Sequence, residues 1–99
     1  MAGEAVSVIL RLVARPDVAA GLKPVLLELT AQSRKEADCI SYHVLENLSD
    51  PCEFTLVEKW TSEGALDAHL KTQHVADAFA KGGPLLAKEP DARRYRRIV

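Results

Sequence analysis

The chain has 99 residues, of which 47% are hydrophobic and 27% are charged. This composition predicts one globular domain over residues 1–99 and excludes a disordered or low-complexity chain. Thirteen basic and fourteen acidic residues give a net charge of -1, which argues against a nucleic-acid-binding protein. No apolar stretch reaches the length of a membrane span, and the start lacks the basic region of a signal peptide. We therefore expect a cytoplasmic protein without membrane contact, whose Cys39 and Cys52 are reduced.

A strand and a helix are expected in the first third of the chain. The stretch from Val6 to Ala14 carries β-branched residues and leucines at successive positions, which is typical of a strand covered on both faces. A helix then begins near Val18 and continues to about Lys35, because apolar residues recur every three to four positions. Pro24 leaves two alternatives: a helix that starts nearer Gly21, or a longer helix kinked at the proline.

The middle of the chain predicts a β-hairpin. Alternating β-forming residues from Cys39 to Asn47 indicate a second strand, and residues 47–51 have the composition of a turn. A third strand ends at Trp60. Because side chains alternate between the faces of a strand, the even-numbered residues of each strand share one face. These residues are Ile40, Tyr42, Val44 and Glu46 in the second strand, and Phe54, Leu56, Glu58 and Trp60 in the third.

Two short helices and a fourth strand are expected in the last third. Thr61 and Ser62 can cap the first helix, and Thr72 can cap the second. Residues 82–84, Gly-Gly-Pro, end the second helix, and the segment up to Asp91 is expected to be a loop or a marginal helical turn. The stretch from Arg93 to Val99 predicts the last strand.

This order of elements predicts an α+β fold of the ferredoxin-like, split βαβ type. Four strands form an open antiparallel sheet, and the helices cover one of its faces. The other face needs a cover, and a second copy of the same sheet is the simplest one. We therefore expect a homodimer whose contact includes Leu45 and Val57.

The known short motifs for metals and nucleotides are missing from the sequence. Neither Cys-x-x-Cys nor His-Glu-x-x-His occurs, and no glycine-rich phosphate loop is present. His69 and His74 are five residues apart and would point to different sides of a continuous helix. We therefore predict that the protein holds no metal ion and needs no nucleotide or flavin cofactor.

The main functional signal is a set of titratable and aromatic side chains expected near one face of the sheet: Tyr42, Glu58, Trp60, His69 and His74. Either histidine is a candidate general base, and the alternative is a histidine that binds a carbonyl at a helix end. For Glu58, a structural hydrogen bond is favoured over acid–base catalysis. Trp60 and Phe79 could line an aromatic pocket, although core packing would explain them equally well.

Four arginines surround Tyr95 near the end of the chain: Arg93, Arg94, Arg96 and Arg97. A solvated edge strand, or salt bridges across a dimer, is the favoured interpretation. The alternative is a clamp for a phosphate or carboxylate group, since arginine binds oxyanions through two parallel hydrogen bonds.

Four motifs follow one another at fixed spacing: Ser33-Arg34-x-Glu36, Cys39-x-x-Tyr42, Phe54-x-Leu56-Val57-Glu58-x-Trp60 and Leu66-x-x-His69-x-x-x-x-His74. Together they resemble the antibiotic biosynthesis monooxygenase family, especially its small quinol-monooxygenase-like members. The resemblance covers nearly the whole chain and implies a dimeric α+β barrel with a pocket between each sheet and its helices. The sequence departs from the family at Asp38, where a glycine is usual, and lacks the first-strand asparagine of the haem-degrading members.

The resemblance implies an enzyme that oxygenates phenols or quinols with dioxygen and without any prosthetic group. Trp60 falls on the family's strand tryptophan, and His69 and His74 fall on its histidine motif. We expect a cofactor-independent monooxygenase of a small quinol-like aromatic, with His69 or His74 as the base and Glu58 as an orienting partner. The expected substrate-binding walls are Tyr42, Trp60, Leu56 and Phe79.

Two other classes of function remain open from the sequence. One is an isomerase of a small phosphorylated carbonyl compound, in which a histidine and an acid would move protons and the arginine strand would hold the phosphate. The other is a non-catalytic dimeric protein that binds a small molecule or serves in a stress response.

Overall fold

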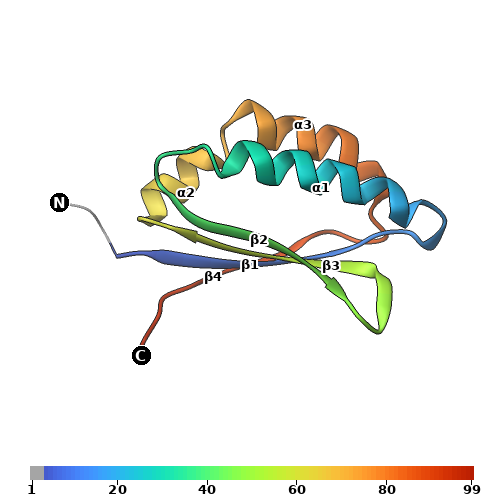
Figure 1. The fold of residues 1–99 in the computed structure, drawn as a ribbon, viewed down its shortest axis with the longest axis horizontal. Coiled ribbons are helices and arrows are strands. Elements are labelled where there is room, and N and C mark those ends of the chain that lie inside the picture. Colours follow the sequence, from blue (N-terminus) through green and yellow to red (C-terminus); the bar gives the residue numbers. More distant parts are fainter. Residues whose placement is uncertain (1–3) are drawn as a thin grey trace.

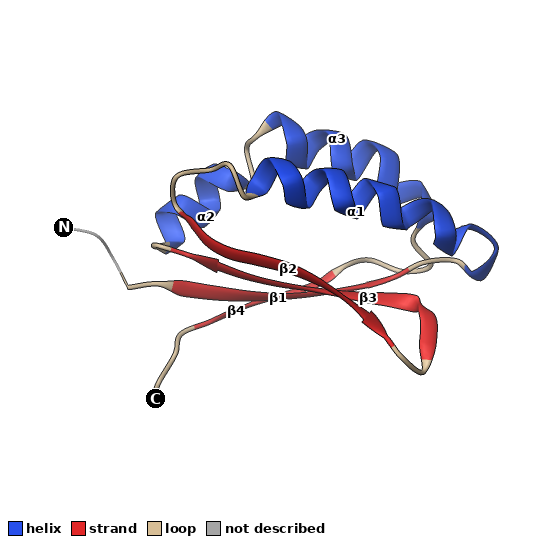
Figure 2. Cartoon of the chain, in the orientation of Figure 1, coloured by secondary structure: helices blue, strands red, loops and turns tan. Residues whose placement is uncertain are grey.

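A computed structural model describes residues 4–99 and has two layers, a four-stranded sheet and the helices on one of its faces (Figures 1 and 2). The strands are β1 (Val6–Val13), β2 (Cys39–Asn47), β3 (Asp50–Trp60) and β4 (Asp91–Tyr95). They lie in the order β2-β3-β1-β4, and each neighbouring pair is antiparallel. The predicted ferredoxin-like α+β fold is therefore confirmed.

Three α-helices form the second layer: α1 (Ala19–Ser33), α2 (Glu63–His69) and α3 (Gln73–Gly82). Short 3-10 helices cover Pro16–Val18 and Gly83–Leu85. In Figure 1, α1 and α3 lie side by side above the sheet, and α2 lies at the end of the layer near the N-terminus. Between residues 4 and 99, no helix combines the length and the hydropathy that crossing a bilayer requires.

Helix α1 differs in its first turn from the helix predicted by the sequence. It begins at Ala19, directly after a 3-10 turn, so Pro24 lies inside the helix and not in its first turn. The alternative of a helix that starts near Gly21 is therefore wrong. Leu22, Leu26 and Leu29 supply the buried stripe of α1, as the three-to-four spacing predicts.

The sequence predicts the start of the last strand two residues too late and its end four residues too late. β4 covers Asp91–Tyr95 instead of Arg93–Val99, because it pairs with β1 from Arg11 opposite Asp91 to Ser7 opposite Tyr95. β1 itself begins at Val6, so the chain after Tyr95 has almost no partner strand left. The length of β4 is thus limited by β1 and not by its own β-forming residues.

The alternation of side chains predicted for β3 is confirmed. Its even-numbered residues point toward the helices, and Leu56 and Trp60 among them are fully buried. β2 follows the same pattern at Tyr42, but a bulge next to Ile40 breaks the register, and Ile40 is half exposed. Full burial of a leucine contributes roughly 2 kcal/mol, so this shared inner face is the main stabilising contact between the layers.

The cap of α2 gives the first prediction. The Ser62 hydroxyl accepts a hydrogen bond of 3.1 Å from the backbone N–H of Ala65. Ser62→Ala leaves that donor unpaired and should lower the free energy of unfolding by about 1 kcal/mol in urea titrations. Ser62→Asp should retain most of the stability.

Ser49 offers a matched control, because it lies in the exposed turn between β2 and β3 and uses its backbone N–H in a hydrogen bond. Ser49→Ala should change the stability by no more than a few tenths of a kcal/mol. An equal loss in both variants would contradict the assignment of Ser62 as a cap.

Candidate active site

A cavity of about 230 Å³ lies between the sheet and the helices. Most of its walls are apolar, with leucines and valines from β1, α1 and α3. Tyr42, Glu58 and His69 are the polar groups that reach it from β2, β3 and α2. Apolar walls with a few convergent polar groups are typical of a site for a small ligand.

The two histidines of the motif come together because the chain turns between α2 and α3. His69 is the last residue of α2, and its carbonyl accepts a hydrogen bond of 2.7 Å from the Thr72 hydroxyl. α3 then starts at Gln73, and the imidazole of His74 lies 5.8 Å from that of His69 between ring centroids. In a continuous helix the two imidazoles would point to different sides, and the break between α2 and α3 removes that separation.

One carboxylate oxygen binds both imidazoles. Oε2 of Glu36 lies 2.6 Å from Nδ1 of His69 and 2.8 Å from Nε2 of His74. An ionised carboxylate only accepts hydrogen bonds, so these two nitrogens carry the protons. A neutral His69 then has its lone pair on Nε2, the nitrogen that lies 4.0 Å from Oε1 of Glu58.

Trp60 lies behind His69 and is not part of the cavity wall. Its ring is fully buried, and its centroid is 4.3 Å from that of the His69 imidazole. The indole N–H donates a hydrogen bond of 3.0 Å to Oε1 of Glu58. Trp60 therefore fixes the positions of both neighbours, and Glu58 makes the structural hydrogen bond that the sequence favoured, with an indole as the partner.

Burial controls the protonation of the cavity groups. It raises the pKa of Glu58 to about 7; the hydrogen bond from Trp60 acts in the opposite direction, and the charge of Glu36 adds to the rise. Burial lowers the pKa of His69, while its hydrogen bond to Glu36 opposes that shift. Burial also raises the pKa of Tyr42. Near neutral pH, His69 is therefore a neutral base and Tyr42 keeps its proton, while Glu58 can exchange one.

The remaining predicted site residues divide into two groups. Leu56 and Phe79 line the cavity together with Tyr42, whereas His74 lies outside it and is connected to the cavity residue His69 through Glu36. Phe79 is exposed on the surface of α3 over 60% of its area, so core packing, the alternative that the sequence left open for it, does not describe its position.

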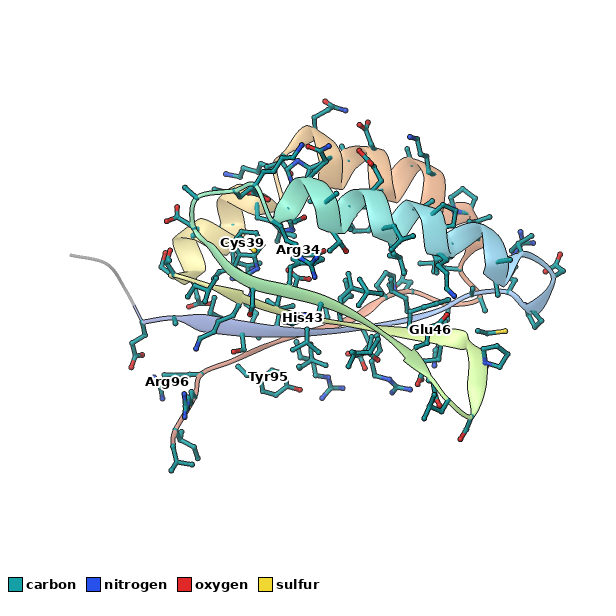
Figure 3. All side chains as sticks on the ribbon, viewed as in Figure 1. Arg34, Cys39, His43, Glu46, Tyr95 and Arg96 are labelled. Atoms are coloured by element: carbon teal, nitrogen blue, oxygen red, sulfur yellow. The ribbon has the colours of Figure 1, made fainter. Side chains whose placement is uncertain are left out.

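The arginines of the last strand are occupied by carboxylates of the same chain. Arg94 lines the cavity and donates to Asp67 (2.8 Å) and Glu63 (3.2 Å) on α2, and Arg93 pairs with Asp91 at 3.0 Å. Figure 3 shows Tyr95 and Arg96 on the side of the sheet that carries no helix, away from the cavity. The arrangement matches a solvated edge strand, and every cation that lines the cavity within residues 4–99 is paired.

The Glu36 cluster also has donors of the type that binds divalent metal ions. Its three ligand atoms, from Glu36, His69 and His74, lie within 4.8 Å of one another. A carboxylate and two imidazoles could hold an ion such as Zn²⁺. The sequence discounted a metal pair because of the spacing along a continuous helix, and the turn between α2 and α3 removes that reason. The hydrogen bonds within the cluster account for its geometry without an ion.

Comparison with known proteins identifies the family. The model of the antibiotic biosynthesis monooxygenase family matches residues 5–81. The chain belongs to this family. Rv0793 of Mycobacterium tuberculosis is 35% identical over 83 residues, which cover 84% of this chain and 81% of that protein. YcnE of Bacillus subtilis is 33% identical over 66 residues, which cover 67% and 70%. Both relatives carry the name "putative monooxygenase".

Solved structures of the family share the fold described above. The structure of Rv0793 superposes with a TM-score of 0.91 at 29% identity over 97% of both chains. A conserved protein from Methanosarcina mazei superposes with a TM-score of 0.90 at 29% identity, over 95% of this chain and 93% of that one. The resemblance found in the four sequence motifs is therefore confirmed.

Sequence reasoning missed the central role of Glu36. The residue was part of a recognised motif, but its partners lie 33 and 38 residues further along the chain. Arg34 was missed in the same way: it donates two hydrogen bonds, of 2.7 and 3.0 Å, to the backbone carbonyl of Tyr42 and so fixes β2 to the end of α1. The available signal was the motif Ser33-Arg34-x-Glu36, which places both charged residues near the predicted end of the helix.

The raised pKa of Glu58 predicts a pH-dependent stability. Between pH 4.5 and about 7, the folded protein keeps a proton on Glu58 that the unfolded chain has lost. The wild-type stability therefore contains a contribution that falls as the pH rises through this window, by at most about 3 kcal/mol. Glu58→Gln removes this contribution, so in urea titrations the variant should gain stability relative to wild type as the pH rises.

The comparison of wild type with Glu58→Gln isolates the contribution of Glu58 to the pH dependence of stability. The lowered pKa of His69 has the opposite effect, because stability then rises with pH up to the pKa of an unfolded histidine. This contribution is present in both proteins and cancels in the difference. A difference in stability that stays constant from about pH 5 to about pH 8 would contradict the assignment.

Proposed function

We propose that the protein oxygenates a small, neutral, electron-rich aromatic alcohol, such as a hydroquinone, with dioxygen and without a cofactor. The observation that carries the proposal is the buried imidazole of His69, which lines an apolar cavity while its Nδ1 is bound to Glu36. The names of the relatives, which describe monooxygenases, support the class of reaction.

The size of the cavity supports a substrate with one or two rings. An apolar cavity of about 150 Å³ is large enough for benzene. The cavity of about 230 Å³ therefore has room for a ring with a few substituents. The T-shaped contact between Tyr42 and His69, with 6.1 Å between ring centroids, leaves an aromatic wall next to the base.

The proposed reaction begins with a proton transfer from a substrate hydroxyl to Nε2 of His69. The resulting phenolate gives electrons to dioxygen, and a carbon–oxygen bond forms at the ring. The ring carbon that bears the new bond then loses its hydrogen to the outer oxygen as the oxygen–oxygen bond breaks. The departing hydroxide takes the other proton back from His69 and becomes water. A hydroquinone and dioxygen thus yield a hydroxyquinone and one water molecule, and the substrate supplies all four electrons.

Glu36, His74 and Glu58 support the base in this scheme. Glu36 keeps the Nδ1 proton in place and stabilises the imidazolium that forms when Nε2 takes up a proton. His74 holds the carboxylate of Glu36 and acts through it, as a positioning residue. Glu58, held by Trp60, is the orienting partner on the cavity side of His69, where its proton can be donated to a substrate oxygen.

The cavity favours this reaction over the isomerisation of a phosphorylated compound. A phosphate needs unpaired cations, but Arg93 and Arg94 are each bound to carboxylates. Glu58 adds a potential negative charge inside the cavity. A neutral aromatic ring needs no unpaired cation and is not repelled by the charge of Glu58.

Substitution of His69 tests the proposed function. In dioxygen-uptake measurements with a panel of hydroquinones, His69→Gln should lower kcat by about 100- to 10,000-fold, because the general base is lost. Glu36→Gln should lower kcat more than it raises KM, because it removes the charge that stabilises the imidazolium.

His43→Gln is the matched control for the loss of an imidazole, because His43 lies on β2 opposite Val57, on the helix-free face of the sheet, and does not line the cavity. Its kcat should equal that of the wild type. Equal uptake by wild type and His69→Gln would remove the histidine mechanism. No uptake by the wild type with any hydroquinone would favour a protein that binds without catalysis.

We also propose that the helix-free face of the sheet forms a homodimer. Ile9 and Val57 lie opposite each other at its centre, and the large side chains of Leu45 and Tyr95 stand about half exposed on the same face. Packing against a second sheet would cover these apolar groups. This proposal does not depend on the chemistry of the cavity.

A charge on this face should separate the subunits. Leu45→Asp should halve the mass measured by sedimentation equilibrium at micromolar concentration, because a carboxylate cannot be buried unpaired in the contact. Leu27→Asp places the same charge on an exposed leucine of α1, outside the proposed contact, and should remain dimeric. A wild-type protein that sediments as a monomer would contradict the proposal.

A further inference from the structure

Two large apolar side chains of the cavity wall are also open to solvent. Leu70, directly after α2, is 50% exposed, and Phe79 on α3 is 60% exposed. A wall residue with this exposure lies where the cavity meets solvent, so we call Leu70 and Phe79 the apolar rim. By contrast, the neighbouring wall residues Leu66 and Val75 are buried. The apolar surface thus continues from the cavity to the outside of the protein.

The charges near the opening are paired with one another. Arg94, which lines the cavity and is partly exposed, binds Glu63 and Asp67, and Arg93 binds Asp91. A charged substituent that emerged from the cavity would meet no unpaired cation among these groups. An apolar substituent would instead cover exposed carbon on the apolar rim.

We propose that the substrate carries an alkyl chain on its ring, and that this chain leaves the cavity across Leu70 and Phe79. The aromatic ring occupies the cavity beside His69, and the two rim residues set the preference for the substituent. This inference deepens the proposed function and rests on it for turnover, but the binding of the ring and its chain is independent of any reaction.

A homologous series of ligands tests the inference. We would titrate 4-alkylphenols, from methyl to pentyl, into the wild-type protein by calorimetry with dioxygen excluded. Complete burial of a methylene group corresponds to about a fourfold gain in affinity, and a half-exposed rim should give about twofold for each methylene. The double variant Leu70→Ser, Phe79→Ser should nearly abolish this dependence on chain length, because the apolar surface that the alkyl chain would cover is removed.

Leu27→Ser supplies the matched control, because Leu27 on α1 is 62% exposed and does not line the cavity. It should keep the wild-type dependence on chain length. A Kd that does not change with chain length in the wild type, or an equal dependence in the double variant, would overturn the inference. The inference would also be overturned if the double variant became monomeric and kept its dependence on chain length. The apolar rim would then be a contact between subunits.

The two proposals can fail separately. A chain-length dependence without dioxygen uptake on hydroquinones would support the rim and contradict the monooxygenase. Uptake on hydroquinones without any chain-length dependence would support the monooxygenase and overturn the rim.

Discussion

The candidate site depends on the double contact made by Oε2 of Glu36. Glu36 lies in the turn after α1, and this oxygen accepts hydrogen bonds from His69 at the end of α2 and His74 at the start of α3. It therefore joins three segments that share no backbone hydrogen-bond ladder. It also determines which nitrogen of His69 carries the proton, and so which nitrogen can act as a base in the cavity. One acceptor thus sets both a tertiary contact and the chemistry that we propose.

The apolar core acts on the same groups. Trp60 and Leu56 exclude water from the inner face of β3, and this exclusion moves the pKa of Glu58 up and that of His69 down. Both shifts favour the neutral forms of the side chains. Apolar burial stabilises the fold, and two titratable side chains lie within the same buried region. Titratable groups with shifted pKa values are found frequently at active sites.

The sequence predicts those features that depend on local periodicity. The faces of β3 and the buried stripe of α1 follow from spacings of two and of three to four residues, and both are confirmed. The errors come from contacts between distant segments. The end of β4 depends on where β1 begins, and the shared contact of His69 and His74 with one oxygen of Glu36 depends on a turn stabilised by Thr72. Glu36 could not be assigned a role for the same reason.

The position of Trp60 has a practical consequence. It is the one tryptophan of the chain, and its ring stacks against His69 behind the cavity wall. Indole emission from this protein therefore originates at a single place, next to the group that we expect to gain and lose a proton. The molecule contains its own spectroscopic probe of that imidazole, and no dye or label has to be attached to follow it.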